Sequence, residues 1–117
     1  MAANPRRGEL YWVSWNPARG NEQAGVRPAL IVSTDAANQN PNYGNVIVAA
    51  LTTRIRQTPT HVAVGPSPDS GLQQESEVMC EQIMTISKER LGQRIGQLNQ
   101  GQLASVDGSV KKALALD

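Results

Sequence analysis

The chain has 117 residues, of which 39% are hydrophobic and 18% are charged, and its formal net charge at pH 7 is +1. This composition fits one globular domain over residues 1–117 and excludes a disordered, highly charged chain. No apolar stretch reaches the roughly 18 residues of a transmembrane helix, and no signal peptide is expected. A single cysteine, Cys80, and a single histidine, His61, exclude an internal disulfide and a two-histidine site within one chain. We therefore expect a cytoplasmic protein without membrane contact.

Apolar segments separated by turn residues predict several short strands. The strands are expected in the ranges 8–15, 27–34, 45–53, 60–64 and 76–83. The ranges 16–26, 35–44 and 65–74 are rich in Gly, Pro, Asn and Ser, and are expected to be loops. The range 45–53 is apolar at nearly every position, which indicates a strand that is buried on both faces.

The end of the chain changes to a helical period. Hydrophobic residues recur there at Leu103, Val106, Val110 and Leu114. Asn99 is a good N-cap residue, and Gln102 three positions later predicts a capping box. Five or six short strands and a terminal helix predict a mainly β (α+β) protein, a small and partly open β-barrel with helical cover.

Two tryptophans in the first predicted strand point to opposite faces of the sheet. Trp12 and Trp15 are three residues apart, and side chains alternate along an extended strand. Tyr11 and Val13 share the face of Trp15, whereas Leu10 shares the face of Trp12. A single-chain barrel has one interior, so one of these faces must meet the C-terminal helix, a second subunit or a ligand.

A polar loop precedes the second predicted strand. Asn21, Glu22 and Gln23 lie between two glycines, and Arg27 follows at the start of the strand. Such a loop can close on a polar ligand, and a guanidinium fixed by a strand can bind a phosphate. A solvated hairpin loop explains the same pattern, and the residues alone do not separate these two interpretations.

A second polar group follows the apolar strand at 45–53. Thr52, Thr53, Arg54 and Arg56 can bind phosphates, or the two arginines can be solvated surface residues. If the strand at 45–53 neighbours the one at 27–34, this group and Arg27 form one shared site.

Polar residues also interrupt the last apolar strand. Glu81 and Gln82 must point to opposite faces of it, so they cannot both be solvated decoration of one face. His61 has no obvious partner and is interpreted as a surface or structural residue. Cys80 is interpreted as a small core residue.

In order along the chain, these segments resemble the MazF/PemK family of toxin endoribonucleases, also called mRNA interferases. The resemblance spans Arg7 to about Leu116, and its motifs are RGELYWVSWNP, GNEQAGVRPALIVS, VIVAALTT, EQIMTI and LASVDGSVKKALAL. The pattern G-x-E-Q-x-G-x-R-P is the specific part. Asn21 stands where Ser is commoner, and the loop DAANQNPNYGN is somewhat long, which bears on sequence preference.

The resemblance implies an SH3-like barrel related to the gyrase poison CcdB, working as a homodimer. It implies cleavage of single-stranded mRNA without a metal or other cofactor, which leaves a 2′,3′-cyclic phosphate and a 5′-hydroxyl and so blocks translation. It also implies a cognate antitoxin of the MazE type that occupies the RNA groove. The catalytic arginine and threonine of the family fall on Arg27 and Thr52, and the loop glutamate that some accounts add falls on Glu22.

The chemistry of the side chains suggests what each would do. Arg27 would stabilise charge at phosphorus, and Thr52 would donate to a non-bridging oxygen. Glu22 is the candidate base, because a guanidinium with a pKa above about 12 is a poor proton acceptor. Trp12 is assigned to a dimer or antitoxin surface. The predicted RNA-binding residues are Asn21, Gln23, Thr53, Arg54, Arg56, Glu81 and Gln82.

Two other functions remain open on the sequence. The same fold can poison a protein target without catalysis, as CcdB does, or can be a structural SH3-like domain without toxicity. The charge distribution favours a focused anion site, because residues 1–60 carry six Arg against three acids (6 − 3 = +3) and residues 61–117 carry five bases against seven acids (5 − 7 = −2). The half that holds Arg27 and Thr52 is therefore the basic one.

Overall fold

Six antiparallel strands and a C-terminal helix build the fold. The computed structural model describes residues 4–15 and 25–116. The elements are β1 (Glu9–Ser14), β2 (Val26–Ile31), α1 (Asp35–Asn38), β3 (Asn45–Thr52), β4 (His61–Val64), β5 (Ser76–Ser87), the 3-10 turn η1 (Lys88–Arg90), β6 (Leu91–Gln97) and α2 (Gln100–Ala113). None of the helices in the described part of the chain is both long and apolar enough to cross a membrane.

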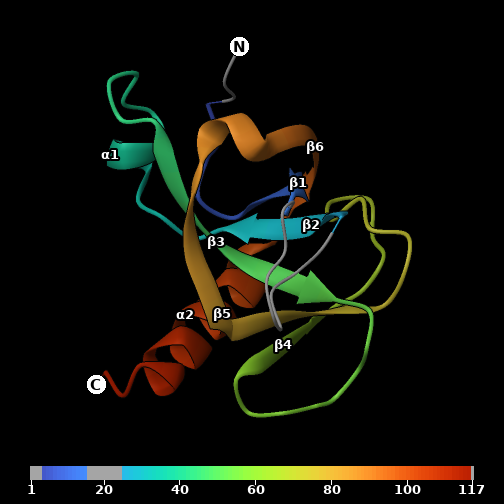
Figure 1. Ribbon diagram of the computed structural model, residues 1–117. Coiled ribbons are helices and arrows are strands. Elements are labelled where there is room, and N and C mark those ends of the chain that lie inside the picture. The colour runs from blue at the N-terminus through green and yellow to red at the C-terminus, as the bar shows by residue number, and fades with distance from the viewer. Residues whose placement is uncertain (1–3, 16–24, 117) are drawn as a thin grey trace.

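The strands form one curved sheet in the order β4-β5-β3-β2-β1-β6, with antiparallel pairing throughout. The register of β3 against β5 shifts between Ala49 and Leu51, and such irregularities bend a strand. Figure 1 shows the result, because the long β5 turns sharply along its length. In the described ranges β4 and β6 are unpaired edges of an open sheet. The mainly β class with a C-terminal helix is confirmed, and "barrel" describes only the curvature.

Two hydrophobic clusters lie on opposite faces of the central strands. The first contains Leu10, Leu30, Ala49, Leu51, Val64, Leu72, Val78, Cys80, Leu98 and Val106. The second contains Tyr11, Val13, Trp15, Ala29, Ile31, Val46, Val48, Ala50, Met79 and Ile86. Because β3 contributes to both, the prediction of a strand buried on two faces is confirmed. Burial of this much apolar surface is the main favourable term that holds the curved sheet together.

The two tryptophans do point to opposite faces. Trp15 is buried in the second cluster, whereas Trp12 lies on the side of Leu10 and stays 41% exposed. The helix α2 packs against β4 and β5 and adds Val106 to the first cluster. It therefore covers the face of Leu10 without reaching Trp12.

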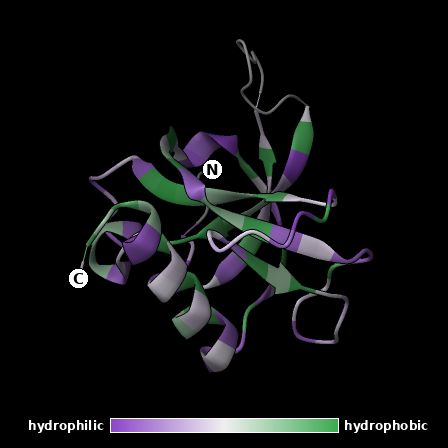
Figure 2. Ribbon diagram, turned by 90° about the horizontal axis from the view of Figure 1, so that it is seen from below, coloured by the Kyte–Doolittle hydropathy of each residue, from purple (hydrophilic) through white to green (hydrophobic). Residues whose placement is uncertain are grey.

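The capping box at the start of α2 is confirmed. The Asn99 side chain accepts from the Gln102 backbone N–H at 2.8 Å, and the Gln102 side chain accepts from the Asn99 N–H at 3.0 Å. Figure 2 shows α2 as largely hydrophilic or neutral, whereas the central strands are mostly hydrophobic. Only Val106 of this helix is fully buried, so a narrow apolar contact fixes it to the sheet.

The structure departs from the predicted elements in four places. The strand β2 ends at Ile31, whereas a strand to residue 34 was predicted. Part of the predicted loop at 35–44 forms the single-turn helix α1, whose Asn38 is buried and hydrogen-bonded to the Ser33 hydroxyl and carbonyl at 2.5 and 2.8 Å. The strand β5 continues to Ser87 instead of ending at 83. The strand β6 was not predicted, because LGQRIGQ is polar and contains two glycines.

A glycine lets the connection between β4 and β5 pack directly on β6. A Cβ at Gly96 would lie 2.2 Å from the Ser70 carbonyl oxygen, a separation that no side chain tolerates. The adjacent Gln97 N–H donates to the Asp69 carbonyl at 2.9 Å. The connection is thereby fixed beside β1 and β6, where it forms one wall of a groove.

Candidate active site

The register of β2 against β3 brings two predicted site residues to one place. Ala29 is paired with Ala50, and Ile31 with Val48. Continuing this register by two residues sets Arg27 opposite Thr52, with both side chains on the face of the second cluster. The expectation that these strands are neighbours is confirmed, and the two polar groups share one end of the sheet.

The hydrogen bonds of Thr52 suit it to bind an anion. Its Oγ1 accepts from the Arg54 backbone N–H at 3.0 Å, which leaves the hydroxyl proton to donate to a substrate oxygen. Thr52 is half-buried and Arg27 is exposed. A phosphate can therefore approach both side chains from solvent.

The predicted loop residues Asn21, Glu22 and Gln23 lie outside the described residues. The chain on either side of them is placed, because the Trp15 N–H donates to the Gly25 carbonyl at 2.8 Å. Both flanks of this loop are thus fixed at the end of the sheet where Arg27 lies.

A groove of about 450 Å³ runs beside this end of the sheet. Its lining residues are Trp12, Val26, Arg27, Pro28, Thr53, Gly71, Leu72, Gln73, Gln74, Ser76, Gln93, Arg94 and Ile95. The predicted site residues Trp12, Arg27 and Thr53 are among them. The surface combines an indole, amides and guanidinium groups, which can stack on and hydrogen-bond to unpaired bases.

Ten of the groove residues were not predicted, and four of these carry amide or guanidinium groups. Gln73 and Gln74 come from the connection before β5, and Gln93 and Arg94 come from β6. The Arg94 Nε donates to a Glu9 carboxylate oxygen at 2.6 Å. The pair Gln73–Gln74 is visible in the sequence, but no spacing relates it to Arg27, because a long-range contact of the loop with β6 places it there.

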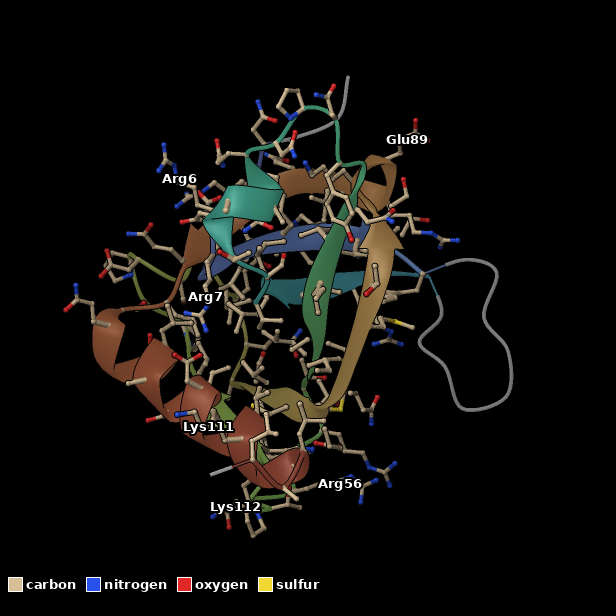
Figure 3. All side chains as sticks on the ribbon, turned by 90° about the vertical axis from the view of Figure 1, so that its left-hand side faces the viewer. Arg6, Arg7, Arg56, Glu89, Lys111 and Lys112 are labelled. Atoms are coloured by element: carbon tan, nitrogen blue, oxygen red, sulfur yellow. The ribbon has the colours of Figure 1, made fainter. Side chains whose placement is uncertain are left out.

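The predicted RNA-binding arginines lie on the segment between β3 and β4. Arg54 and Arg56 are both exposed, and neither lines the groove. Figure 3 shows the Arg56 side chain directed outward at one end of the molecule. These arginines lie on the segment that follows the end of β3.

Glu81 and Gln82 take part in a polar cluster on β5. Glu81 accepts from the Thr60 hydroxyl at 3.1 Å and lies 3.1 Å from the His61 Nε2. The Gln82 amide reaches the Glu81 carboxylate at 3.5 Å. Glu81 remains 37% exposed, so one side of its carboxylate faces solvent.

The interpretation of His61 as a residue without an obvious partner is wrong. Its side chain is only 5% exposed, and its Nδ1 lies 2.8 Å from a Glu77 carboxylate oxygen, so it lies between two glutamates. Burial lowers the pKa of His61, but the hydrogen bonds and charges of Glu77 and Glu81 outweigh it, and the pKa is raised. The sequence hides these contacts because β4 and β5 are paired over a long connection.

Burial accounts for Cys80, the remaining reactive side chain considered in the sequence. Cys80 belongs to the first cluster, as predicted, and burial raises the pKa of its thiol to about 11. Within residues 4–15 and 25–116, no three His, Cys, Asp or Glu side chains are grouped in a way that could hold a metal ion.

A curved antiparallel sheet that presents an arginine and a threonine beside a polar groove defines a small β protein with a candidate site for an anion. Residues 6–114 match the family described as PemK-like, MazF-like toxin of type II toxin–antitoxin system. The chain belongs to this family.

Individual relatives support this assignment over almost the full chain. Endoribonuclease EndoA of Bacillus subtilis (strain 168) is 37% identical over 114 residues, which are 95% of each protein. The Mycobacterium tuberculosis toxin MazF-mt6 is 29% identical with a TM-score of 0.78, covering 93% of this chain and 98% of that one. An endoribonuclease in complex with its cognate antitoxin, from Mycobacterial species, is 32% identical with a TM-score of 0.80 and 97% coverage of both chains. These relatives give no support to the noncatalytic, CcdB-like alternative.

Proposed function

We propose that this toxin cleaves single-stranded mRNA where Arg27 and Thr52 meet, with the 2′-hydroxyl of the RNA as the nucleophile. Its endoribonuclease activity follows from the family and from the 37% identical endoribonuclease. The single observation that supports the site is the β2–β3 register, which puts Arg27 opposite Thr52 on one face when it is continued two residues beyond the last pair, Ala29–Ala50.

The reaction is an in-line displacement at phosphorus. The 2′-oxygen loses its proton and bonds to phosphorus, and the bond from phosphorus to the 5′-oxygen breaks. The products are a 2′,3′-cyclic phosphate and a 5′-hydroxyl, whose oxygen takes up a proton. Arg27 stabilises the extra charge on the phosphoryl oxygens, and Thr52 donates its hydroxyl proton to one of them.

The proposed base is Glu22. Arg27 cannot accept the 2′-proton readily, because a guanidinium keeps its own proton below a pH of about 12. Glu22 belongs to the segment that joins Trp15 to Gly25, whose two flanks are fixed beside Arg27. A carboxylate on this segment is the acid–base group nearest to Arg27 along the chain.

The groove and its surroundings are proposed to bind the RNA. Thr53, Arg54 and Arg56 would hold phosphates, and the amides of the groove would meet base edges. Of the other predicted residues, Asn21, Gln23, Glu81 and Gln82 are assigned to base contacts.

Trp12 is proposed to belong to a dimer or antitoxin surface, because it is a large aromatic side chain that remains 41% exposed at the groove. The partners would be a second copy of this chain and a MazE-type antitoxin that covers the groove. One relative was solved with its cognate antitoxin, which supports this assignment. Both partners and the mRNA would be met in the cytoplasm.

The test is cleavage of a long RNA by purified protein in the presence of EDTA. We expect discrete fragments with 5′-hydroxyl and cyclic phosphate ends from the native chain and none from Arg27→Ala. The matched control is Arg6→Ala, which removes an exposed arginine outside the groove. Intact RNA with the native chain would refute the proposed function, and normal cleavage by Arg27→Ala would refute the site.

A further inference from the structure

A row of polar side chains crosses the sheet beyond the proposed catalytic pair. Thr52 of β3 is paired directly with Glu77 of β5, and residues opposite each other in an antiparallel pair project from the same face. His61 of β4 is paired with Met79, which sets it diagonally between Glu77 and Glu81. Arg27, Thr52, Glu77 and His61 therefore follow one another across four strands.

Glu77 is a buried carboxylate whose oxygens are fully engaged. Its side chain is 3% exposed, and it accepts from the backbone N–H groups of Arg56 at 3.0 Å and Gln57 at 2.9 Å. The His61 Nδ1 is the third partner, at 2.8 Å. The Arg56 N–H, despite the cost of burial, keeps the pKa of Glu77 low, with help from His61 and the Gln57 N–H. A buried charge needs such hydrogen-bond partners. The Glu77 carboxylate therefore stays ionised because of these three contacts, and the contacts in turn need the ionised carboxylate.

The segment that Glu77 binds has an unusual backbone. Gln57 has a φ of 55°, in the left-handed region that costs a residue with a side chain about 1 kcal/mol or more. Such a conformation persists only where the surroundings fix it. The Glu77 carboxylate does so by accepting two consecutive N–H groups at this turn.

We propose that Glu77, held by His61, is a positioning residue that fixes residues 53–60 in the conformation that presents Arg54 and Arg56 to RNA phosphates. The side chain of Glu77 is buried and touches no substrate, so it acts through the backbone of Arg56 and Gln57. This inference rests on the proposed function, because it assigns RNA phosphates to the two arginines.

The test compares Glu77→Gln with Glu75→Gln. Both variants remove one negative charge, but Glu75 is exposed and lies two residues earlier. In Glu77→Gln the introduced amide keeps the size of the side chain and offers one acceptor oxygen in place of two. Three quantities are measured: hydrogen exchange of the Arg56 and Gln57 amides, the Kd for an RNA carrying a 2′-deoxy nucleotide at the cleavage position, and the dependence of that Kd on salt.

We expect Glu77→Gln to speed exchange of the two amides about tenfold or more and to weaken RNA binding by a similar factor, since charged hydrogen bonds are lost. The slope of log Kd against log salt should fall by about 1.4, the loss expected for two phosphate contacts to a single strand. Glu75→Gln should change neither exchange nor slope. A Glu77→Gln variant that matches Glu75→Gln in all three readouts overturns the inference.

A rescue variant separates positioning from a general loss of structure. Glycine adopts a φ of 55° without strain, so Gln57→Gly added to Glu77→Gln should recover part of the lost affinity. A double variant that binds no more tightly than Glu77→Gln overturns the inference. A reversibly unfolded fraction raises the apparent Kd, so the folded fraction of each variant is measured by urea unfolding and the apparent Kd is multiplied by it before the variants are compared. Failure of the native chain to cleave RNA would instead refute the proposed function, which is a separate outcome.

Discussion

Two polar regions lie on one face of the sheet and differ in how far they are exposed. One is the rim with Arg27 and Thr52, and the other is the cluster of His61 with Glu77. At the rim, Arg27 is exposed and the Thr52 hydroxyl retains a proton to donate. In the cluster, His61 and Glu77 are almost wholly buried and bind each other. The groups proposed to meet the substrate are thus accessible to solvent, while the groups proposed to fix the backbone are buried against one another.

The largest effect on the cleavage rate is expected from Arg27→Ala, which removes the exposed guanidinium at the rim. Loss of a positioned charge donor typically lowers the rate by about 10² to 10³. The free energy of unfolding should change by less than about 0.5 kcal/mol, because the side chain is exposed. Single-turnover cleavage and urea unfolding measure the two effects, and an unfolding midpoint that falls along with the rate would contradict this separation.

A smaller loss of rate is expected at Thr52. Thr52→Val keeps the shape of the side chain and removes the hydroxyl, which should slow cleavage by about 10- to 100-fold, the effect of one hydrogen bond to a charged group. Thr52→Ser keeps the hydroxyl and should retain most of the rate. A Thr52→Val variant that cleaves at the native rate would contradict the hydrogen-bonding role, and a Thr52→Ser variant as slow as Thr52→Val would mean that packing of the methyl group is needed as well.

In the cluster, the expected effect is on stability and depends on pH. The raised pKa of His61 contributes stability that is present below its ordinary value of 6.5 and is lost as pH rises through the raised pKa. The lowered pKa values of Glu77 and Glu81 contribute stability that is present above 4.5 and is lost as pH falls through the lowered values. The contribution is therefore largest between these two limits.

His61→Gln should accordingly destabilise the protein by about 2 kcal/mol near pH 5.5 and by less near pH 8.5, because breaking a buried ion pair is costly. Urea unfolding of both proteins at the two pH values measures the difference. An equal loss at both pH values would mean that His61 contributes through packing alone.

The smallest effect is expected from Arg56→Ala. One exposed arginine that contacts one phosphate should change RNA affinity by a few-fold and lower the salt slope by about 0.7. Titration of the uncleavable RNA at several salt concentrations measures it. A salt slope equal to that of the native chain would remove Arg56 from the RNA-binding surface.

Local sequence patterns correctly predicted those elements that depend on neighbouring residues or on a continuous apolar run. The run at 45–53 and the Asn99 capping box were predicted correctly, because alternation and capping are properties of neighbouring residues. The strand β6 was missed, because its pairing with β1 and not its own composition makes it a strand.

For the site, too, some residues could be identified from the sequence and others could not. The sequence resemblance, and not any spacing, assigned roles to Arg27 and Thr52, and the pairing of β2 with β3 puts them at the same end of the sheet. The partners of His61 could not be predicted, since Glu77 and Glu81 are 16 and 20 residues away in the sequence. Gln73 and Gln93 reach the groove through packing of the loop at Gly96, which leaves no local signal.

The positions of the groove's lining residues along the chain also determine when the groove can form during protein synthesis. Trp12 lies on β1 and Ile95 on β6, so the groove forms only after residues 12 to 95 have been made. A nascent chain whose β6 is still inside the ribosome has paired only one edge of β1. The surface proposed to bind RNA therefore does not exist until β6 has left the ribosome and paired with β1.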